Sequence, residues 1–275
     1  MFKCIRIPIW PPFLFIDTFP TNIWQAIGSM QVTIHFALLS FCIYVTDFIV
    51  IPEIFETPSP KKFLTTFTCI THQLCMLRNF YKSIFTSSKV VQTQLNADDA
   101  LTTTTCKKCD QLRPIRSHHC SVCEACIDKM DHHCYVLNNC IGRYNYRYFF
   151  SYICLTLVNA VMTFVLCLMN MKQLKKEILE IKMKREKVYL FDLLPKLPVR
   201  AGLVLLISGI TMVMLVYLVG YHLFLVYKDE TTIERKYPTL KVNNTSLNKT
   251  KKMSFRCKVY KMLHSNTLLD IYLPD

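Results

Sequence analysis

The feature that most constrains this chain is a run of cysteines and histidines between Cys106 and Cys140. The run holds seven of the fourteen cysteines and four of the eight histidines in the chain. Three cysteine pairs, beginning at Cys106, Cys120 and Cys123, have two residues between their members. That spacing lets one tight turn present both sulfurs to a single tetrahedral metal ion. Two such sites would use eight of these eleven side chains, so the sequence predicts two zinc ions and three side chains left for other chemistry.

A disulfide framework is the competing explanation for so many cysteines. Seven cysteines cannot all form disulfides within the run. A disulfide within any close pair would also form a small, strained and easily reduced ring. Zinc-bound thiolates need reducing surroundings, so the run is expected to face the cytosol. A pair of structural zinc sites in a binding module without catalysis is a further alternative, and spacing alone does not distinguish it from an enzyme.

The segment from Asp131 to Cys134 favours catalysis. If His133 binds zinc, then Asp131, His132 and Cys134 leave a carboxylate, an imidazole and a thiol within four residues. These groups can orient a base, accept a proton and form a thiolate nucleophile. A zinc ion nearby would add positive charge and stabilise that thiolate further.

The full spacing of this run resembles that of one protein family. It reads C-x2-C-x9-H-C-x2-C-x2-C-x4-D-H-H-C-x5-C-x4-N-x3-F, from Cys106 to Asn145 and Phe149. This is the pattern of the Asp-His-His-Cys (DHHC) protein S-acyltransferases, or palmitoyltransferases, and the chain matches it at every fixed position. A match at so many fixed positions does not arise easily by chance.

The resemblance implies two interleaved structural zinc sites, each with three cysteines and one histidine. One would use Cys106, Cys109, His119 and Cys126, and the other would use Cys120, Cys123, His133 and Cys140. It also implies that Cys134 is the nucleophile, that His132 is its base and that Asp131 orients His132. The expected enzyme is a protein-cysteine S-palmitoyltransferase. A long-chain acyl group would pass from acyl-coenzyme A to Cys134, and then to a cysteine of a protein substrate.

Apolar segments predict that this is a membrane protein. Hydrophobic residues make up 52% of the chain, and four stretches approach the roughly 20 residues needed to cross a bilayer. The expected fold is an all-α integral membrane protein with four transmembrane helices and a small cytosolic double-zinc domain between helices 2 and 3. The segments are 1–28, N-terminal cytosolic or interfacial; 31–51, first span; 63–81, second and least apolar span; 82–147, cytosolic linker and zinc domain; 148–169, third span; 170–200, lumenal loop; 201–227, fourth span; and 228–275, cytosolic tail.

One further motif and two departures follow from the resemblance. A Thr-Thr-x-Glu motif, which in the family packs against the catalytic domain, is matched by Thr231, Thr232 and Glu234. Residues 87–89 (Ser-Ser-Lys) stand where the family has Asp-Pro-Gly, so no residue there turns as freely as glycine. Residues 135–136 (Tyr-Val) replace the Pro-Trp that usually follows the motif cysteine, and the tryptophan normally lines the acyl entrance.

The net charge of +14 points to anionic partners. Because the chain is so apolar, the expected partner is the anionic cytoplasmic leaflet of a membrane, and nucleic acid is not expected. By resemblance the phosphates of acyl-coenzyme A are a second polyanion, and the candidates to bind them are Arg113, Arg116, Lys129 and Arg143. The zinc domain lies on the side of the membrane richer in Lys and Arg, as expected for the cytosol. The family's usual location is the endoplasmic reticulum or the Golgi.

The third predicted span begins within ten residues of Cys140, so the nucleophile should lie close to the bilayer surface. Protein substrates are therefore expected to carry membrane-proximal cysteines. His118 is left outside both zinc sites. His222, near the end of the fourth span, is expected at the membrane interface and not in catalysis.

Two other functions are compatible with zinc sites on a membrane protein. A zinc-dependent adaptor would need the metal sites but not Cys134. A membrane-anchored zinc-finger ubiquitin ligase is disfavoured, because it would need a long gap between its first two cysteine pairs and a different order of histidines.

Overall fold

The computed structural model describes residues 21–55, 57–91, 103–183 and 199–238, together with 254, 257–259 and 272. The chain divides into two compact units. The first unit contains Met1–His35, Arg78–Tyr152 and Gly220–Asp275, and the second contains Phe36–Leu77 and Ile153–Val219. Parts of four predicted segments lie outside the described residues. They are 1–20 of segment 1–28, 92–102 of segment 82–147, 184–198 of segment 170–200, and most of 239–275 in segment 228–275.

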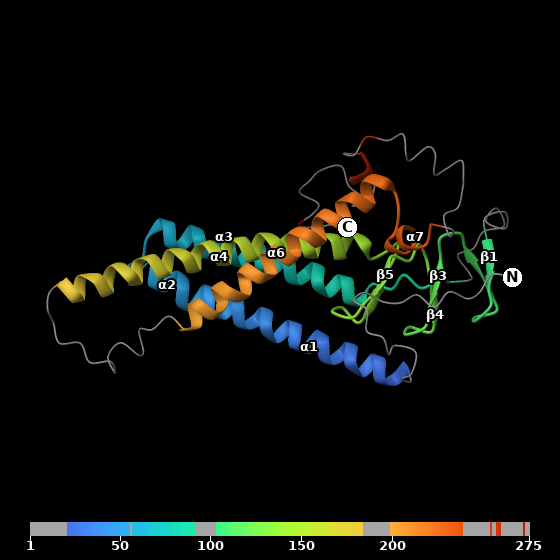
Figure 1. Cartoon of the computed structure of the whole chain (residues 1–275), viewed down its shortest axis with the longest axis horizontal. Helices are drawn as coiled ribbons and strands as arrows, with labels where there is room; N and C mark the ends of the chain where they lie inside the picture. Colours follow the sequence, from blue (N-terminus) through green and yellow to red (C-terminus); the bar gives the residue numbers. More distant parts are fainter. Residues whose placement is uncertain are drawn as a thin grey trace. The chain divides into compact units, whose positions relative to one another are not determined.

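Long helices make up most of the described chain (Figure 1). They are α1 (Thr21–Val45), the π-helical turn η1 (Thr46–Val50), α2 (Ile51–Ile54), α3 (Pro60–Phe85), α4 (Tyr146–Met183), α6 (Val199–Lys228) and the short α7 (Thr232–Lys236). Helix α4 does not end at the predicted end of the third span. It continues from residue 169 to Met183, through a lysine-rich sequence with few residues that break a helix.

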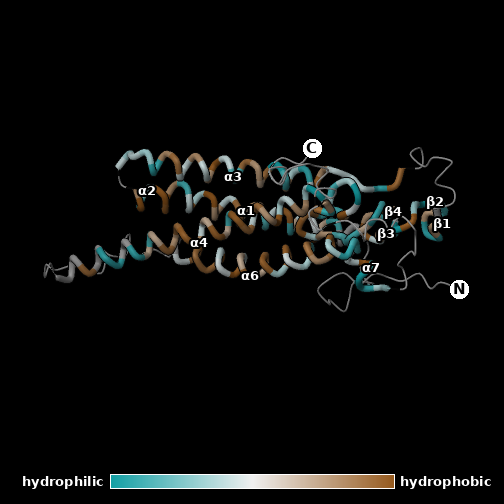
Figure 2. Tube along the Cα trace, turned by 90° about the horizontal axis from the view of Figure 1, so that it is seen from above, coloured by the Kyte–Doolittle hydropathy of each residue, from teal (hydrophilic) through white to brown (hydrophobic). Residues whose placement is uncertain are grey.

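Three helical stretches of the described chain are long and apolar enough to cross a membrane. They are Gln25–Ile54, Tyr146–Lys172 and Gly202–Lys228. These stretches overlap the first, third and fourth predicted spans. The predicted second span, 63–81, lies inside α3, but α3 does not reach the same hydropathy, and Figure 2 shows white and teal residues among its brown ones.

The polar residues of α3 explain its lower hydropathy. His72 and Gln73 are buried within the second unit. His72 Nε2 is 2.9 Å from the carbonyl oxygen of Leu155, and Gln73 Nε2 donates to Asp47 Oδ1 at 3.2 Å. The exposed side chains of α3 include Phe63, Leu64, Phe67, Ile70 and Leu74. The helix is therefore apolar on its outer surface, and its polar groups are paired inside the unit.

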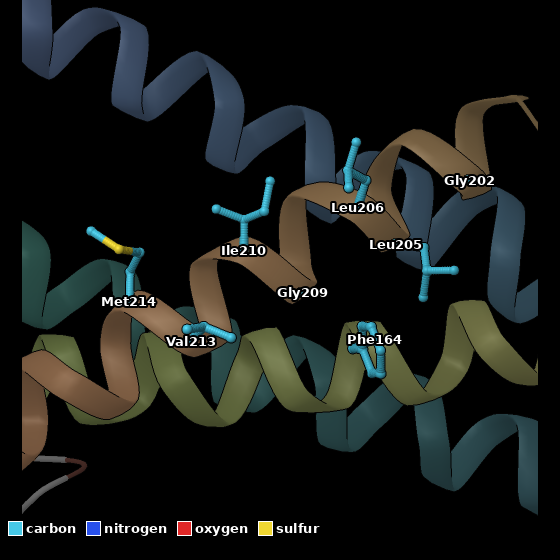
Figure 3. A pocket seen from close by; sticks show the side chains of 8 residues that line it. All are labelled: Phe164, Gly202, Leu205, Leu206, Gly209, Ile210, Val213 and Met214. Atoms are coloured by element: carbon cyan, nitrogen blue, oxygen red, sulfur yellow. The ribbon is translucent and has the colours of Figure 1, made fainter.

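The second unit is held together by an apolar core contributed by all of its helices. The core residues are Val45, Val50, Ile51, Cys69, Leu166, Cys167 and Val204. Beside it, Phe164 of α4 and residues 202–214 of α6 line an apolar groove of about 560 Å³ (Figure 3). A Cβ atom at Gly209 would lie 3.3 Å from the Phe164 ring, so glycine allows the close approach of these helices.

Three antiparallel hairpins form the cysteine-rich part of the first unit. Their strands are β1 (Thr103–Cys106) with β2 (Gln111–Pro114), β3 (His118–Cys120) with β4 (Ala125–Ile127), and β5 (His132–Cys134) with β6 (Asn139–Ile141). The turns contain Asp110, Glu124 and Asn138, whose φ angles are 50°, 50° and 46°. Each of these residues lies four positions after the cysteine that ends the first strand of its own hairpin. The three turns are thus built in the same way.

The second and third hairpins also share their cross-strand pairs. His119 lies opposite Cys126 in the second hairpin, and His133 lies opposite Cys140 in the third. The second hairpin carries the close cysteine pair Cys120 and Cys123. At the two equivalent positions the third hairpin has Cys134 and the buried Leu137. We call this three-membered series the hairpin repeat.

The segment in place of the expected Asp-Pro-Gly motif docks as an extended strand. The Ser88 carbonyl accepts from Asp128 N at 2.8 Å, and Val90 N donates to the Cys126 carbonyl at 2.8 Å. Lys89 forms a β-bridge with Ile127. None of residues 87–90 has a positive φ, so no glycine is needed at this point of the described chain.

Ser88 and Asn145 tie the end of α3 to the hairpins. Ser88 Oγ donates to Asn145 Oδ1 at 3.0 Å and accepts from Tyr144 N at 3.1 Å. The Asn145 side chain is fully buried and donates to the carbonyls of Thr86 and Cys140, at 3.0 and 2.9 Å. It thereby satisfies a carbonyl at the open C-terminal end of a helix and one in β6.

We predict that Ser88→Ala destabilises the chain by about 1–3 kcal/mol, because two buried hydrogen bonds are lost and their partners stay in place. Ser87→Ala is the matched control, since Ser87 is exposed and bonds only the neighbouring Lys89 N. Thermal unfolding of both purified variants measures the difference. Equal midpoints for the two variants would show that Ser88 does not hold this junction.

Candidate active site and metal centres

The first candidate metal centre joins the first hairpin to the base of the second, and each candidate is called a metal centre below. It consists of Cys106, Cys109, His119 and Cys126, whose ligand atoms all lie within 4.8 Å of one another. The Sγ of Cys109 is 3.1 Å from His119 Nδ1, and the Sγ of Cys106 is 3.8 Å from the same atom. Cys126 Sγ is 3.8 Å from Cys109 Sγ.

The second metal centre repeats this arrangement one hairpin later. It consists of Cys120, Cys123, His133 and Cys140, again with all ligand atoms within 4.8 Å of one another. His133 Nδ1 lies 3.4 to 3.7 Å from the three sulfurs. Each pair of sulfurs from one turn therefore meets the cross-strand His–Cys pair of the following hairpin.

The distances between ligand atoms agree with tetrahedral zinc. With Zn–S near 2.3 Å and Zn–N near 2.0 Å, the edges of such a tetrahedron are about 3.8 Å between sulfurs and about 3.5 Å from sulfur to nitrogen. The separations in both centres scatter around these values. The eight side chains assigned by resemblance are thus the eight that the structure groups into two four-ligand sets.

The remaining cysteine of the hairpin repeat, Cys134, lies beside His132 and Asp131. His132 Nδ1 is 2.7 Å from Asp131 Oδ2, and the His132 ring has a hydrogen bond with the Cys134 side chain. The Asp131 carboxylate is buried, whereas Cys134 is partly exposed. The order carboxylate, imidazole, thiol is the one that lets a base accept the thiol proton and keep its ring orientation.

The electrostatics of this group favour an ion pair. Burial would lower the pKa of His132, but its hydrogen bonds to Asp131 and Cys134 outweigh burial and raise that pKa to about 10. Burial would raise the pKa of Asp131, but the hydrogen bond and charge of His132 lower it to about 2. Asp131 is therefore a carboxylate and His132 holds a proton firmly.

The Thr-Thr-x-Glu motif fixes Asp131 from the other end of the chain. Thr232 donates to Asp131 through its backbone N, at 2.9 Å to Oδ1, and through its hydroxyl, at 2.8 Å to Oδ2. Thr231 is the N-cap of α7, and its side chain and that of Glu234 form a reciprocal capping box. Asp131 therefore accepts three hydrogen bonds, two of them from a residue 101 positions away.

Glu234 also forms a buried ion pair with Arg116. Arg116 Nε and Nη2 donate to the two carboxylate oxygens at 2.5 and 2.6 Å, and Nη2 also donates to the Asp229 carbonyl at 3.1 Å. The two side chains are only 13% and 5% exposed. Arg116, predicted as a candidate to bind coenzyme A, is thus engaged in holding α7 against the hairpins.

The other three basic candidates are more accessible. Lys129 is 39% exposed and lies 3.8 Å from Asp229, and Arg143 is 50% exposed and pairs with Asp128 at 2.5 Å. Arg113 lies on β2 and contacts the Thr104 hydroxyl at 3.4 Å. His118 lies outside both metal centres, and burial together with nearby Arg113 lowers its pKa to about 4.

Two residues that replace the expected Pro-Trp lie in the third hairpin turn. The Tyr135 ring packs edge-on against the imidazole of His133, with ring centres 5.0 Å apart. Val136 is 41% exposed. The first substitution therefore adds an aromatic contact to a metal ligand.

Sequence reasoning did not relate His222 to the Asp131–His132–Cys134 group. Only 2% of the residue is exposed, and its ring centre is 6.1 Å from that of His132. Its place at the membrane interface stays a prediction. A histidine near the end of an apolar helix is a signal of a functional residue, but nothing in the sequence related His222 to His132, which is 90 positions away.

The fold and the site together define a class of protein: helical membrane proteins that carry a cysteine-rich domain with two four-residue clusters able to hold metal ions and a Cys–His–Asp group. Residues 99–237 match the DHHC palmitoyltransferase family, which is half of the chain. The chain belongs to this family.

Named relatives agree with this assignment. The chain is 37% identical over 133 residues to palmitoyltransferase ZDHHC16B of Danio rerio, covering 48% of this chain and 34% of that protein. It is 32% identical over 142 residues to palmitoyltransferase ZDHHC16 of Homo sapiens, covering 52% and 36%. It is 31% identical over 129 residues to a probable protein S-acyltransferase of Arabidopsis thaliana, covering 47% and 29%. The matches thus span about a third of the length of these relatives.

Proposed function

We propose that this chain is a protein S-acyltransferase that moves a long-chain acyl group, such as palmitoyl, from acyl-coenzyme A to cysteines of proteins. The observation that carries the proposal is the group formed by Asp131, His132 and Cys134 next to the second metal centre. This group contains a thiol, a base and an anchored carboxylate, and only Cys134 of the hairpin repeat's seven cysteines is outside the two metal centres. Membership of the family and the names of the relatives support the same activity.

The proposed reaction consists of two thioester exchanges. In the reactive state His132 holds the proton that the Cys134 thiol has given up, and the Cys134 sulfur attacks the acyl carbon of acyl-coenzyme A. The bond to the coenzyme A sulfur breaks, and that sulfur takes the proton from His132 and leaves as free coenzyme A. The thiol of a substrate cysteine then gives its proton to His132 and attacks the acyl-Cys134 thioester, and Cys134 leaves as the group that pairs again with protonated His132. Because one thioester replaces another, catalysis consists mainly of thiolate formation and positioning.

The metal centres have a structural part in this proposal. Each is a closed set of four ligands, which suits structural zinc and leaves no open position for a substrate. When bound, the two zinc ions supply the cross-links that fix the turns of the hairpins. His133, a ligand, immediately precedes Cys134, so the second centre holds the nucleophile's strand in place.

Acyl-coenzyme A binding is assigned to basic residues outside the buried ion pair. Arg116 is paired with Glu234 and Asp229, so Arg113, Lys129 and Arg143 are the stronger candidates to meet the phosphates. Burying an acyl chain stabilises the complex by about 0.8 kcal/mol per CH₂.

The proposed topology has four spans with the hairpins in the cytosol. Three spans meet the length and hydropathy requirements, and α3 qualifies as the fourth because its outer surface is apolar and its polar residues are paired. Reduced cysteines at the metal centres support a cytosolic hairpin domain, and the proposed location is an endomembrane, either endoplasmic reticulum or Golgi. Substrates would be proteins with cysteines close to the membrane.

The test is transfer of a clickable palmitoyl-coenzyme A analogue to the purified full chain. We expect the wild type to carry label that hydroxylamine removes, and Cys134→Ser to carry none while keeping two zinc ions. Cys257→Ser is the matched control, because Cys257 is exposed and lies outside both metal centres. It should label as the wild type does.

A wild type that keeps two zinc ions but takes no label would contradict the proposal. The chain would then be a zinc-dependent membrane adaptor, which needs the metal centres but not Cys134.

A further inference from the structure

The rings of Phe149 and His222 pack against the side chain of His132. Phe149 of α4 lies edge-on to the His132 ring, with centres 5.2 Å apart and planes at 70°. His222 of α6 lies edge-on to Phe149 in turn, with centres 5.0 Å apart and planes at 73°. His222 is also 6.1 Å from His132 itself, so the three rings contact one another.

A hydrogen bond fixes the orientation of the His222 ring. Tyr146, in the first turn of α4, has its hydroxyl 2.9 Å from His222 Nδ1, and its own ring packs at 62° to the imidazole. His222 is only 2% exposed. An imidazole this deeply buried needs such a partner, and the bond together with the packing of the Tyr146 and Phe149 rings orients the imidazole.

We propose that His222 is a positioning residue for His132, held by Tyr146 and acting together with Phe149 as an aromatic wall. The proposal rests on the proposed acyl transfer, since it assigns His132 as the base of Cys134. Asp131 holds one nitrogen of the His132 ring, but a single hydrogen bond lets the ring swing about its axis. Phe149 and His222 pack against the His132 ring and limit that rotation, so the other nitrogen stays directed at Cys134.

The proposal gives the stretch from the last turns of α6 to the start of α7 two separate roles at the same site. His222 braces His132, and Thr232, ten residues later, holds Asp131 by two hydrogen bonds. Both members of the carboxylate–imidazole pair are therefore positioned from one short stretch of the chain. A displacement of about 1 Å at a reacting group can reduce the rate about a hundredfold, so such bracing has a measurable effect.

His222→Ala should lower the maximal rate of self-acylation about tenfold to a hundredfold and leave the half-saturating acyl-coenzyme A concentration unchanged. His222→Phe keeps a ring in the wall and should recover most of the rate. Tyr146→Phe removes only the hydrogen bond and should lower the rate about threefold to tenfold. It keeps the experiment informative if His222→Ala fails to fold. Tyr144→Phe is the matched control, because it makes the same change on a residue that is 45% exposed.

A second readout needs no acyl donor. The rate at which iodoacetamide alkylates Cys134, followed by mass spectrometry of its peptide, reports how well His132 activates the thiol. We expect it to fall in His222→Ala and Tyr146→Phe, with two zinc ions retained. Wild-type rates in both variants would overturn the inference, and so would a changed half-saturating concentration at an unchanged maximal rate. If the wild type alkylates rapidly, the variants slowly, and none transfers acyl groups, then the inference holds and the proposed function fails.

Discussion

Replacing Cys140 by serine should lower the bound zinc from two ions per chain to one and abolish acyl transfer. Cys140 supplies one of four ligands in the second metal centre and lies opposite His133 in the third hairpin. A structural zinc site contributes about 10–16 kcal/mol, whereas a whole domain is stable by only about 5–15 kcal/mol. The apolar core of the hairpins is small, consisting of Val122, Ile127, Met130 and Ile233 with two of the ligand cysteines. Loss of the metal therefore exceeds what this core can offset.

The measurement is zinc content together with acyl transfer on purified protein. Cys134→Ser is the control from the same hairpin, because it should lose acyl transfer but keep both zinc ions. A strong chelator applied to the wild type should abolish activity, and added zinc should restore it if refolding is reversible. Two zinc ions in Cys140→Ser would show that Cys140 is not a ligand.

Glu234→Leu should destabilise the chain by about 3–5 kcal/mol, the usual cost of removing one partner from a buried ion pair. Arg116 would keep its charge in a position that is only 13% exposed. The same change removes half of the capping box of α7, a helix of five residues that has little stability of its own. Because Thr232 begins this helix, Asp131 would lose its anchor and the acylation rate should fall with stability.

The double variant Arg116→Met with Glu234→Leu separates these effects. Replacing both members of a buried pair by apolar residues is often neutral or stabilising, so thermal stability should largely return while the capping box stays broken. Arg235→Gln on the same helix is the control, since Arg235 is 50% exposed and its pair with Glu230 is worth about 0.2–1 kcal/mol. If Glu234→Leu unfolds no earlier than Arg235→Gln, the ion pair does not stabilise the site.

Local spacing predicted the tight turns at the close cysteine pairs, and the resemblance predicted the ligand sets, because both depend on residues within 35 positions of one another. Spacing alone could not divide eleven candidate ligands between two centres. The structure resolves this through register, since His119 faces Cys126 and His133 faces Cys140 across adjacent strands.

Contacts between distant parts of the chain could not be predicted in this way. Arg116 appeared to be a free basic residue, but its partner Glu234 is 118 positions away. The low hydropathy of α3 suggested a weak span, yet His72 and Gln73 are paired inside the second unit. A one-dimensional pattern records the polarity of a residue but not the partner that compensates for it.

The hairpin repeat has a consequence for the origin of the reactive thiol. The two sulfurs of each turn are completed by the cross-strand pair of the next hairpin, so every metal centre requires a successor in the series. The third hairpin is followed by α4 and has no successor. Its first position still presents a cysteine, Cys134, and its second has become Leu137. A series of three hairpins can thus close only two centres, and in the described chain the sulfur at its open end lies outside both of them.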